Sequence, residues 1–291
     1  MKHQSAWISI VVTLAFVSVS TAIGQTYNFR TVQVPNAQST TPYGINDSGV
    51  ISGNYTDSSG VTHCFMLSGH TFTTLTDANG IGTSCFGINT AGAIVGSYAL
   101  AAGFSNGFVY QNGIFTDIIV PTATAGTIAY GINDAGLVVG QFGDNVGIHG
   151  FLFNGSTYQT LDAPGASITA AVGINSSNLI TLQSLNSSGF LSSWLLSGTR
   201  YTVLSVPGAA ITAVHSINNR NEIAFEWFDS SNQVHGAVRS GPKYYFIDDP
   251  GGTNTSIDTI NDRNVIVGHF LPTGGTQNQG FQGVGVLAAA R

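Results

Sequence analysis

The sequence predicts an all-β protein, a six-bladed β-propeller of four-stranded blades, and three observations lead to this fold class. An eleven-residue stretch recurs, first as YGINDSGVISG from Tyr43, then as FGINTAGAIVG from Phe86 and YGINDAGLVVG from Tyr130. A grid with a spacing of 43 residues extends this period along the chain, at Pro35, Pro121, Pro164, Pro207 and Pro250, with Ala78 on the remaining node. Each 43-residue unit contains four short runs rich in β-branched and aromatic residues. Six repeats, each with four strands, match the number of blades and of strands per blade in a six-bladed β-propeller.

The third unit shows its four predicted strands most clearly, at residues 114–120, 127–133, 137–142 and 148–153. The segment Asn133-Asp134-Ala135-Gly136 stands between the second and third of these runs. Asn and Asp side chains hydrogen-bond to the backbone in such turns, and glycine accepts the positive φ at the exit. The repeated Gly-Ile-Asn is therefore interpreted as a strand end followed by a hairpin turn.

The two ends of the repeated region are predicted to meet in one blade. Residues 27–35 form one complete strand, and residues 280–286 form the last strand of the final unit. Pairing them closes the ring without an exposed sheet edge. A β-solenoid is the competing architecture, but its coils usually contain fewer residues and need terminal caps that the sequence does not show.

The first 24 residues read as a secretory signal peptide. Lys2 and His3 are followed by an apolar run at 6–19 and by small residues suited to cleavage. A membrane anchor is the alternative, but this run is shorter than the ~20 residues that span a bilayer and no basic stop follows it. The sequence thus predicts one propeller domain at 25–291, monomeric and with no membrane span in the mature chain. Its predicted location is secreted or extracellular, with the periplasm as the alternative.

Composition restricts the classes of partner. Only 8% of the residues are charged, against roughly a quarter in an average soluble domain. The formal net charge is −6, so the chain lacks the basic surface that nucleic acid requires. Hydrophobic residues make up 43% of the chain, which excludes a disordered protein.

The two cysteines, Cys64 and Cys85, are a candidate disulfide. Export to an oxidising compartment permits the bond, and both residues replace other residue types in adjacent repeats. A local link between neighbouring units is therefore predicted. Two buried free thiols in a slot for small residues are the alternative.

Three histidines are a candidate zinc site. His63, His149 and His235 recur every 86 residues, and three imidazoles form a common zinc set. They fall on the predicted third strand of alternate blades, roughly 10 Å farther from the axis than the innermost strand, and cannot meet at one ion. They are interpreted as turn or inter-blade residues that bond to the backbone. No metal or cofactor is predicted.

Acidic residues offer no clear catalytic pair within one blade. Glu222 and Glu226 lie on one face of a predicted strand but ~13 Å apart, whereas glycosidase pairs need roughly 5 to 9.5 Å. Asp47, Asp134 and Asp262 recur at the hairpin turn and are interpreted as structural. The chain contains no nucleophile elbow and no nucleotide-binding loop. A carboxylate pair formed across blades is left open.

The repeat resembles the probable extracellular repeat family of bacteria named HAF repeats after a His-Ala-Phe tripeptide. The corresponding tripeptides are His63-Cys64-Phe65, Asn106-Gly107-Phe108, His149-Gly150-Phe151, Ser192-Ser193-Trp194, His235-Gly236-Ala237 and Gln279-Gly280-Phe281. The resemblance covers nearly the whole chain after the predicted signal peptide, and it implies export and repetition but no particular reaction. Units four and five depart from the pattern, with NLITLQS and NEIAFEW, either through divergence for binding or through drift.

These observations predict an exported, non-enzymatic binding or surface-interaction module. A rigid propeller presents loops from every blade on one face, which suits recognition, and the low charge favours a carbohydrate or an envelope protein as ligand. The alternative is an extracellular glycoside hydrolase or lyase that uses acidic residues from different blades at the channel. The fold alone does not separate the two, because propellers host both roles.

Overall fold

A computed structural model describes residues 26–101 and 103–286. The predicted signal peptide at 1–24 lies outside the described residues. The described part of the chain consists of strands and turns, with no helix, so the predicted all-β class is confirmed. No helix long and apolar enough to cross a membrane occurs in these residues.

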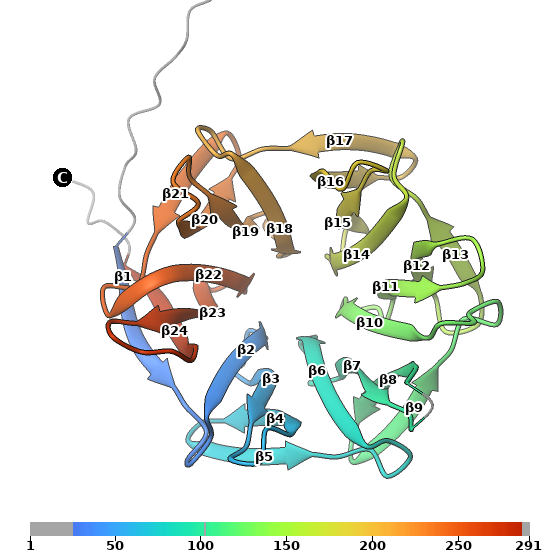
Figure 1. Cartoon of the computed structure of the whole chain (residues 1–291), viewed down its shortest axis with the longest axis horizontal. Helices are drawn as coiled ribbons and strands as arrows, with labels where there is room; N and C mark the ends of the chain where they lie inside the picture. Colours follow the sequence, from blue (N-terminus) through green and yellow to red (C-terminus); the bar gives the residue numbers. More distant parts are fainter. Residues whose placement is uncertain (1–25, 102, 287–291) are drawn as a thin grey trace, which may run out of the picture.

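Twenty-four strands are arranged as six blades around a central axis (Figure 1). Blades one to three consist of β2 (Ser39–Ile45), β3 (Ile51–Thr56), β4 (Thr62–Ser68) and β5 (Thr71–Leu75); β6 (Gly82–Ile88), β7 (Ile94–Ala99), β8 (Ser105–Gln111) and β9 (Ile114–Ile118); β10 (Thr127–Ile132), β11 (Val138–Gly143), β12 (Ile148–Phe153) and β13 (Tyr158–Leu161). Blades four to six consist of β14 (Ile168–Ile174), β15 (Leu179–Leu185), β16 (Leu191–Ser197) and β17 (Arg200–Leu204); β18 (Ile211–Ile217), β19 (Ile223–Phe228), β20 (Val234–Ser240) and β21 (Lys243–Ile247); β22 (Gly252–Ile260), β23 (Val265–Pro272), β24 (Gln279–Val286) and β1 (Thr26–Val32).

Each blade is an antiparallel sheet of four strands, as the repeat predicts. Blades three and four are also joined by one parallel pair, Ile148 with Ile168, which merges their two sheets into one of eight strands. Strands β2, β6, β10, β14, β18 and β22 are innermost (Figure 1). The sequence unit begins one strand earlier than the blade, because its first strand is the outermost strand of the preceding blade.

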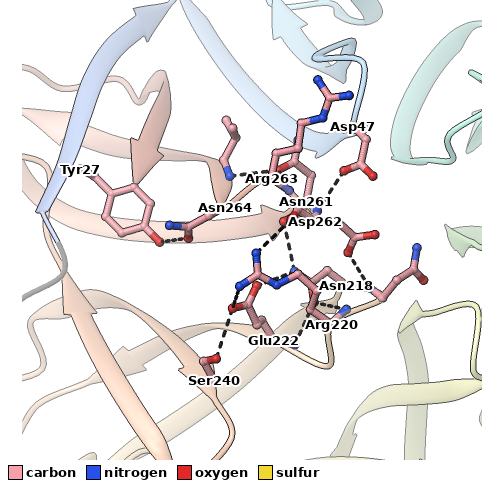
Figure 2. Close-up of polar contacts among 12 residues, drawn as sticks. Tyr27, Asp47, Asn218, Arg220, Glu222, Ser240, Asn261, Asp262, Arg263 and Asn264 are labelled. Carbon is pink, nitrogen blue, oxygen red and sulfur yellow. Dashed lines mark hydrogen bonds and ion pairs between the residues drawn. The ribbon is translucent and has the colours of Figure 1, made fainter. Parts of the chain in front are cut away.

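The ring closes through the two ends of the described chain. Strand β1 pairs with β24 over seven residue pairs, from Thr26 with Val286 to Val32 with Gly280. The Tyr27 hydroxyl also donates a hydrogen bond to Asn264 Oδ1 at 2.9 Å, linking β1 to the turn between β22 and β23 (Figure 2). The predicted closure of the ring within one blade is confirmed.

The core of most blades contains a glycine on the second strand opposite a phenylalanine on the third. Gly96 pairs with Phe108 and Gly140 with Phe151, and both phenylalanines are fully buried. A Cβ at Gly96 would stand 2.0 Å from a backbone oxygen and 2.7 Å from the Phe108 ring, so the ring occupies the space that the glycine leaves. An aromatic residue on the outermost strand packs edge-on against this ring, as in Phe108 with Phe115 at 4.9 Å.

The same pairing explains why blade five departs from the repeat. Phe225 stands on the second strand directly opposite Ala237 on the third, and both are fully buried. The large and the small residue have exchanged strands, so the volume of the core is retained. In blade four, Leu182 opposite Trp194 fills the same place. At these positions the departure is a compensated change of core packing.

The sulfur atoms of Cys64 and Cys85 are bonded, and their Cα atoms are 5.2 Å apart. Cys64 lies on β4 and Cys85 on β6, so the bond joins blades one and two. Both residues are fully buried within one cluster that includes Leu75 and Phe108.

Candidate functional site

The asparagines of Gly-Ile-Asn form a closed ring of hydrogen bonds at one end of the channel. Each donates its Nδ2 to the backbone oxygen of the equivalent asparagine in the next blade, at 3.0–3.1 Å, in the order Asn46, Asn89, Asn133, Asn175, Asn218, Asn261 and back to Asn46. Figure 2 shows the part of this asparagine ring that contains Asn218 and Asn261. All six side chains are buried. The Gly-Ile-Asn motif thus joins neighbouring blades as well as ending a strand.

The residues that follow these asparagines form a second, outer series of bonds. Asp262 N donates to Asp47 Oδ1 at 2.9 Å (Figure 2), and Thr90 N donates to Asp134 Oδ1 at the same distance. Burial alone would raise the pKa of Asp134, but hydrogen bonds from Thr90, Asn219 and other neighbours outweigh it and lower that pKa. The cavity at this mouth is small, about 90 Å³. The recurring aspartates are structural, as predicted, but their bonds cross from blade to blade.

A belt of isoleucines from the same motif divides the channel. Ile88, Ile132, Ile174 and Ile217 line both the small cavity at the asparagine ring and a larger one beyond it. In blades one to four, the glycine before this isoleucine lets the innermost strands approach each other closely. A Cβ at Gly44 would stand 2.6 Å from the Phe86 oxygen of the next blade.

The residue two positions before the isoleucine of this motif occupies a β-bulge in every blade, and in blades five and six Ser216 and Thr259 replace the glycine that follows it. The pairing of the innermost with the second strand skips one residue or more at this point, for example between Ala129 and Gly131. A bulge leaves its extra residue outside the ladder and can turn the side chain toward a site. The residues at these positions are Tyr43, Phe86, Tyr130, Val172, His215 and Asp258. All six line the larger cavity.

Blades one to three contribute an aromatic wall. The Phe86 ring lies between those of Tyr43 and Tyr130, with centroid distances of 5.4 and 5.0 Å and angles of 65° and 62°. Neighbouring blades of a six-bladed propeller are rotated by one sixth of a full turn, and both interplanar angles are close to this rotation. The three rings therefore follow the symmetry of the fold. Burial raises the pKa of Tyr130 to about 12. The pKa of Tyr43 is also raised, first by burial and then by the negative charge of Asp258. Both hydroxyls therefore stay protonated at neutral pH.

Blades five and six contribute a polar wall opposite. His269 Nδ1 lies 2.9 Å from Asp258 Oδ2, and His215 Nδ1 lies 3.9 Å from Asp258 Oδ1. The Asp258 side chain is 2% exposed, and its Oδ1 has no hydrogen-bond partner among the described residues. Burial alone would lower the pKa of His269, but the charge and hydrogen bond of Asp258, with a contribution from Glu226, raise it. The wall therefore contains a hydrogen-bonded His269–Asp258 pair that favours the protonated form of His269.

The larger cavity has a volume of about 420 Å³, within the range of small-molecule sites. Gln141 and Gln183 line it toward the face opposite the asparagine ring, and Gln183 Nε2 is bonded to Val214 O at 2.8 Å. No lysine or arginine is among the lining residues of the described chain. The cavity offers one apolar face and one face of hydrogen-bonding groups, without a fixed cation.

The pH dependence of stability reports on the His269–Asp258 pair. The folded-state pKa of His269 is raised above its ordinary value of 6.5, so protonation of His269 stabilises the folded state. That contribution is complete below about pH 6.5 and is lost as the pH rises through the raised pKa. We expect His269→Gln to flatten the decline in the free energy of unfolding above pH 6.5, measured by urea titration at several pH values. Equal slopes in the two proteins would contradict a charged pair.

The three repeated histidines lie on third strands of alternate blades, as predicted, but they bond to aspartates rather than to the backbone. His63 Nε2 lies 2.8 Å from Asp57 Oδ2, and His235 Nδ1 lies 2.9 Å from Asp248 Oδ2. His149 contacts Asp162 in the same way. The sequence interpretation was wrong about the partner. Asp57 meets His63 across the hairpin between β3 and β4, six residues away, whereas Asp162 and Asp248 stand 13 residues from their histidines and meet them through strand pairing.

The two glutamates have separate environments. Glu222 is buried and accepts hydrogen bonds from Asn218, Arg220 and Ser240 at 2.8–3.2 Å, which gives it a structural role (Figure 2). Glu226 is half-buried on β19, and its charge acts on His269 and Tyr43. Asp258 is the one carboxylate among the described residues that lines the larger cavity. Across 26–101 and 103–286, no group of three His, Cys, Asp or Glu side chains is placed to hold a metal ion.

The sequence interpretation did not identify the channel residues, although one signal was present. The position before Gly-Ile-Asn is aromatic in units one to three and then changes to Val172, His215 and Asp258, while its neighbours remain similar. When one position varies while the rest of the motif is retained, the fold does not require a particular side chain at that position. Only the bulges, which are not visible in the sequence, show that all six side chains reach one cavity.

No protein-family model matches the chain, and no curated protein matches it. Solved structures do match. A mutant of the Aleuria aurantia lectin in complex with Fucα1-6GlcNAc is 12% identical, with a TM-score of 0.52 over 90% of this chain and 100% of the lectin. Another structure of this fungal lectin, described as a six-bladed β-propeller with a novel fucose recognition mode, is 14% identical, with a TM-score of 0.50 and the same coverage.

TolB from Acinetobacter baumannii is 10% identical, with a TM-score of 0.60 over 81% of this chain and 64% of TolB. The shared fold is the β-propeller. At such identities the likeness extends to the fold and not to any particular residue.

Proposed function

We propose that this protein is an exported carbohydrate-binding β-propeller of the HAF-repeat type, which holds a sugar in the cavity between the isoleucine belt and the face opposite the asparagine ring. The observation that carries the proposal is the division of this cavity into an aromatic wall and a polar wall. A sugar ring has an apolar face that stacks on aromatic side chains and hydroxyl groups that need hydrogen-bond partners.

The dimensions and the polarity of the cavity support this ligand class. A volume of about 420 Å³ suits one or two sugar units and is too small for a folded protein segment. The imidazole of His215 and the amides of Gln141 and Gln183 supply hydrogen-bonding groups along the lining. The fold supports it as well, because the matching Aleuria aurantia structures are lectins. Export follows from the predicted signal peptide at 1–24.

The test is a glycan-binding screen followed by calorimetry with the best ligand. We expect Phe86→Ala to weaken binding about tenfold or more, because removing a central aromatic contact typically costs at least 1–2 kcal/mol. Phe190→Ala is the matched control, since Phe190 is 70% exposed in the turn between β15 and β16. It should bind with unchanged affinity. The proposal fails when no glycan binds, or when Phe86→Ala binds as tightly as the wild type.

A further inference from the structure

The polar wall contains a carboxylate oxygen whose bonding is incomplete. Asp258 is buried, and Oδ2 is satisfied by His269 whereas Oδ1 is not. The nearest nitrogen of His215 is 3.9 Å from Oδ1, too far for a hydrogen bond. A buried polar atom without a partner costs free energy, and in a native structure it calls for an explanation.

The local charge is negative. Glu226 adds a second carboxylate whose charge reaches both His269 and Tyr43. The imidazoles of His269 and His215 lie beside Asp258. No lysine or arginine of the described chain lines the cavity to add a permanent positive charge.

The opposite wall also suits a cation. The faces of aromatic rings attract ammonium groups, and the wall offers Tyr130 in the blade opposite Asp258 and Tyr43 in the blade next to it. An ammonium group donates up to three hydrogen bonds and carries the positive charge that a buried carboxylate favours. A neutral hydroxyl or acetamido group can donate a hydrogen bond to the carboxylate, but it carries no positive charge.

We propose that the sugar bound in this cavity is an amino sugar with a free, protonated amine, which donates to Asp258 Oδ1. This inference rests on the proposed function and narrows its ligand class. Asp258 lines the cavity but its Oδ1 is buried, so the half-buried His215 side chain has to turn aside as the amine enters. The sugar ring then stacks on the aromatic wall while its ammonium group reaches the carboxylate.

The experiment compares three oligosaccharides of equal length and linkage, built from glucosamine, N-acetylglucosamine or glucose, in calorimetry at pH 7. The hydroxyl and ring oxygens of glucosamine make its ammonium group more acidic than that of a simple amine, so the comparison is repeated at pH 6, where a larger fraction of the amine is protonated. We expect the glucosamine oligomer to bind at least about tenfold more tightly than the other two. In Asp258→Asn this preference should disappear. Asp162→Asn is the matched control, because Asp162 contacts His149 Nδ1 outside the channel, and it should keep the preference.

Each remaining outcome decides the matter. Equal binding of the three oligomers by the wild type, or a preference that survives in Asp258→Asn, would overturn the inference while leaving carbohydrate binding in place. Failure of all three and of every glycan in the screen would overturn the proposed function as well. If Asp258→Asn does not fold, Glu226→Gln replaces it, and its preference for glucosamine should fall at least about threefold because one of the two carboxylate charges is removed.

Discussion

Asn133→Ala is expected to lower the free energy of unfolding by about 3 kcal/mol. The substitution removes the Nδ2 bond to Asn175 O in the next blade, at 3.1 Å. It also leaves the backbone N–H groups of Ala135 and Leu137 without the Asn133 Oδ1 acceptor. Because Asn133 is 4% exposed, water replaces these partners poorly. A loss of this size is a large part of the 5–15 kcal/mol that stabilises a typical domain.

Asn186→Ala is the matched control, since Asn186 makes the same two turn bonds without the bond between blades. Its Oδ1 accepts from Ser188 N and Phe190 N at 2.9 and 3.1 Å, and the side chain is exposed. Denaturant unfolding of the two variants isolates the asparagine ring, and the control should lose less than about 1 kcal/mol. Equal losses would show that the turn, and not the ring, accounts for the motif.

Deletion of residues 26–32, which removes β1, is expected to abolish cooperative folding. Tyr27 and Val32 are 7% and 2% exposed, and Phe29 packs edge-on against Phe281 at 5.3 Å. Burial of these three side chains contributes about 5 kcal/mol or more, which is comparable to the net stability of a domain. The deletion also leaves β24 with an unpaired edge, which favours aggregation.

A synthetic peptide with the sequence of residues 26–34 should restore folding when it is added to the truncated chain. An extended peptide can pair with an exposed sheet edge, and the seven residue pairs of β1 with β24 set its register. Recovery of the far-ultraviolet spectrum and of a monomeric elution volume is the measurement. A truncated protein that is monomeric and as stable as the full chain would contradict ring closure through β1.

Much of the fold was predictable because the repeat constrains it at every level. The 43-residue grid, the four runs per unit and the turn residues agree with one another, and they predicted six blades and a closing blade made from both ends of the chain. The link between Cys64 and Cys85 followed from two unusual residues in adjacent units. Periodic positions in a repeat protein report on the packing that every unit shares.

The contacts between blades and the channel could not be predicted in the same way. The partner of Asn133 is about one unit distant, and nothing local in the sequence distinguishes a bond within a turn from a bond to the next blade. Tyr43 and Asp258 face one cavity because of β-bulges, which depend on pairing with a second strand. The partner of His149 was wrongly predicted for a similar reason, since Asp162 reaches it only through the pairing of β12 and β13.

The asparagine ring and the isoleucine belt restrict one end of the channel, whereas the variable positions line the larger cavity directly beyond the belt. The invariant part of the motif therefore stabilises the propeller, and the residue before it is free to determine the chemistry of the cavity. The proposed sugar site is therefore in the channel and not at the three peripheral histidines, each of which is already bonded to an aspartate.

The most direct measurement is a crystal structure of the protein with the tightest-binding glycan from the screen. The account predicts density for a sugar inside the channel, stacked on Phe86 or a neighbouring ring and hydrogen-bonded to the wall that contains His215 and Asp258. Density for the glycan only at the outer surface, between blades or at the turns, with an empty channel, would contradict it.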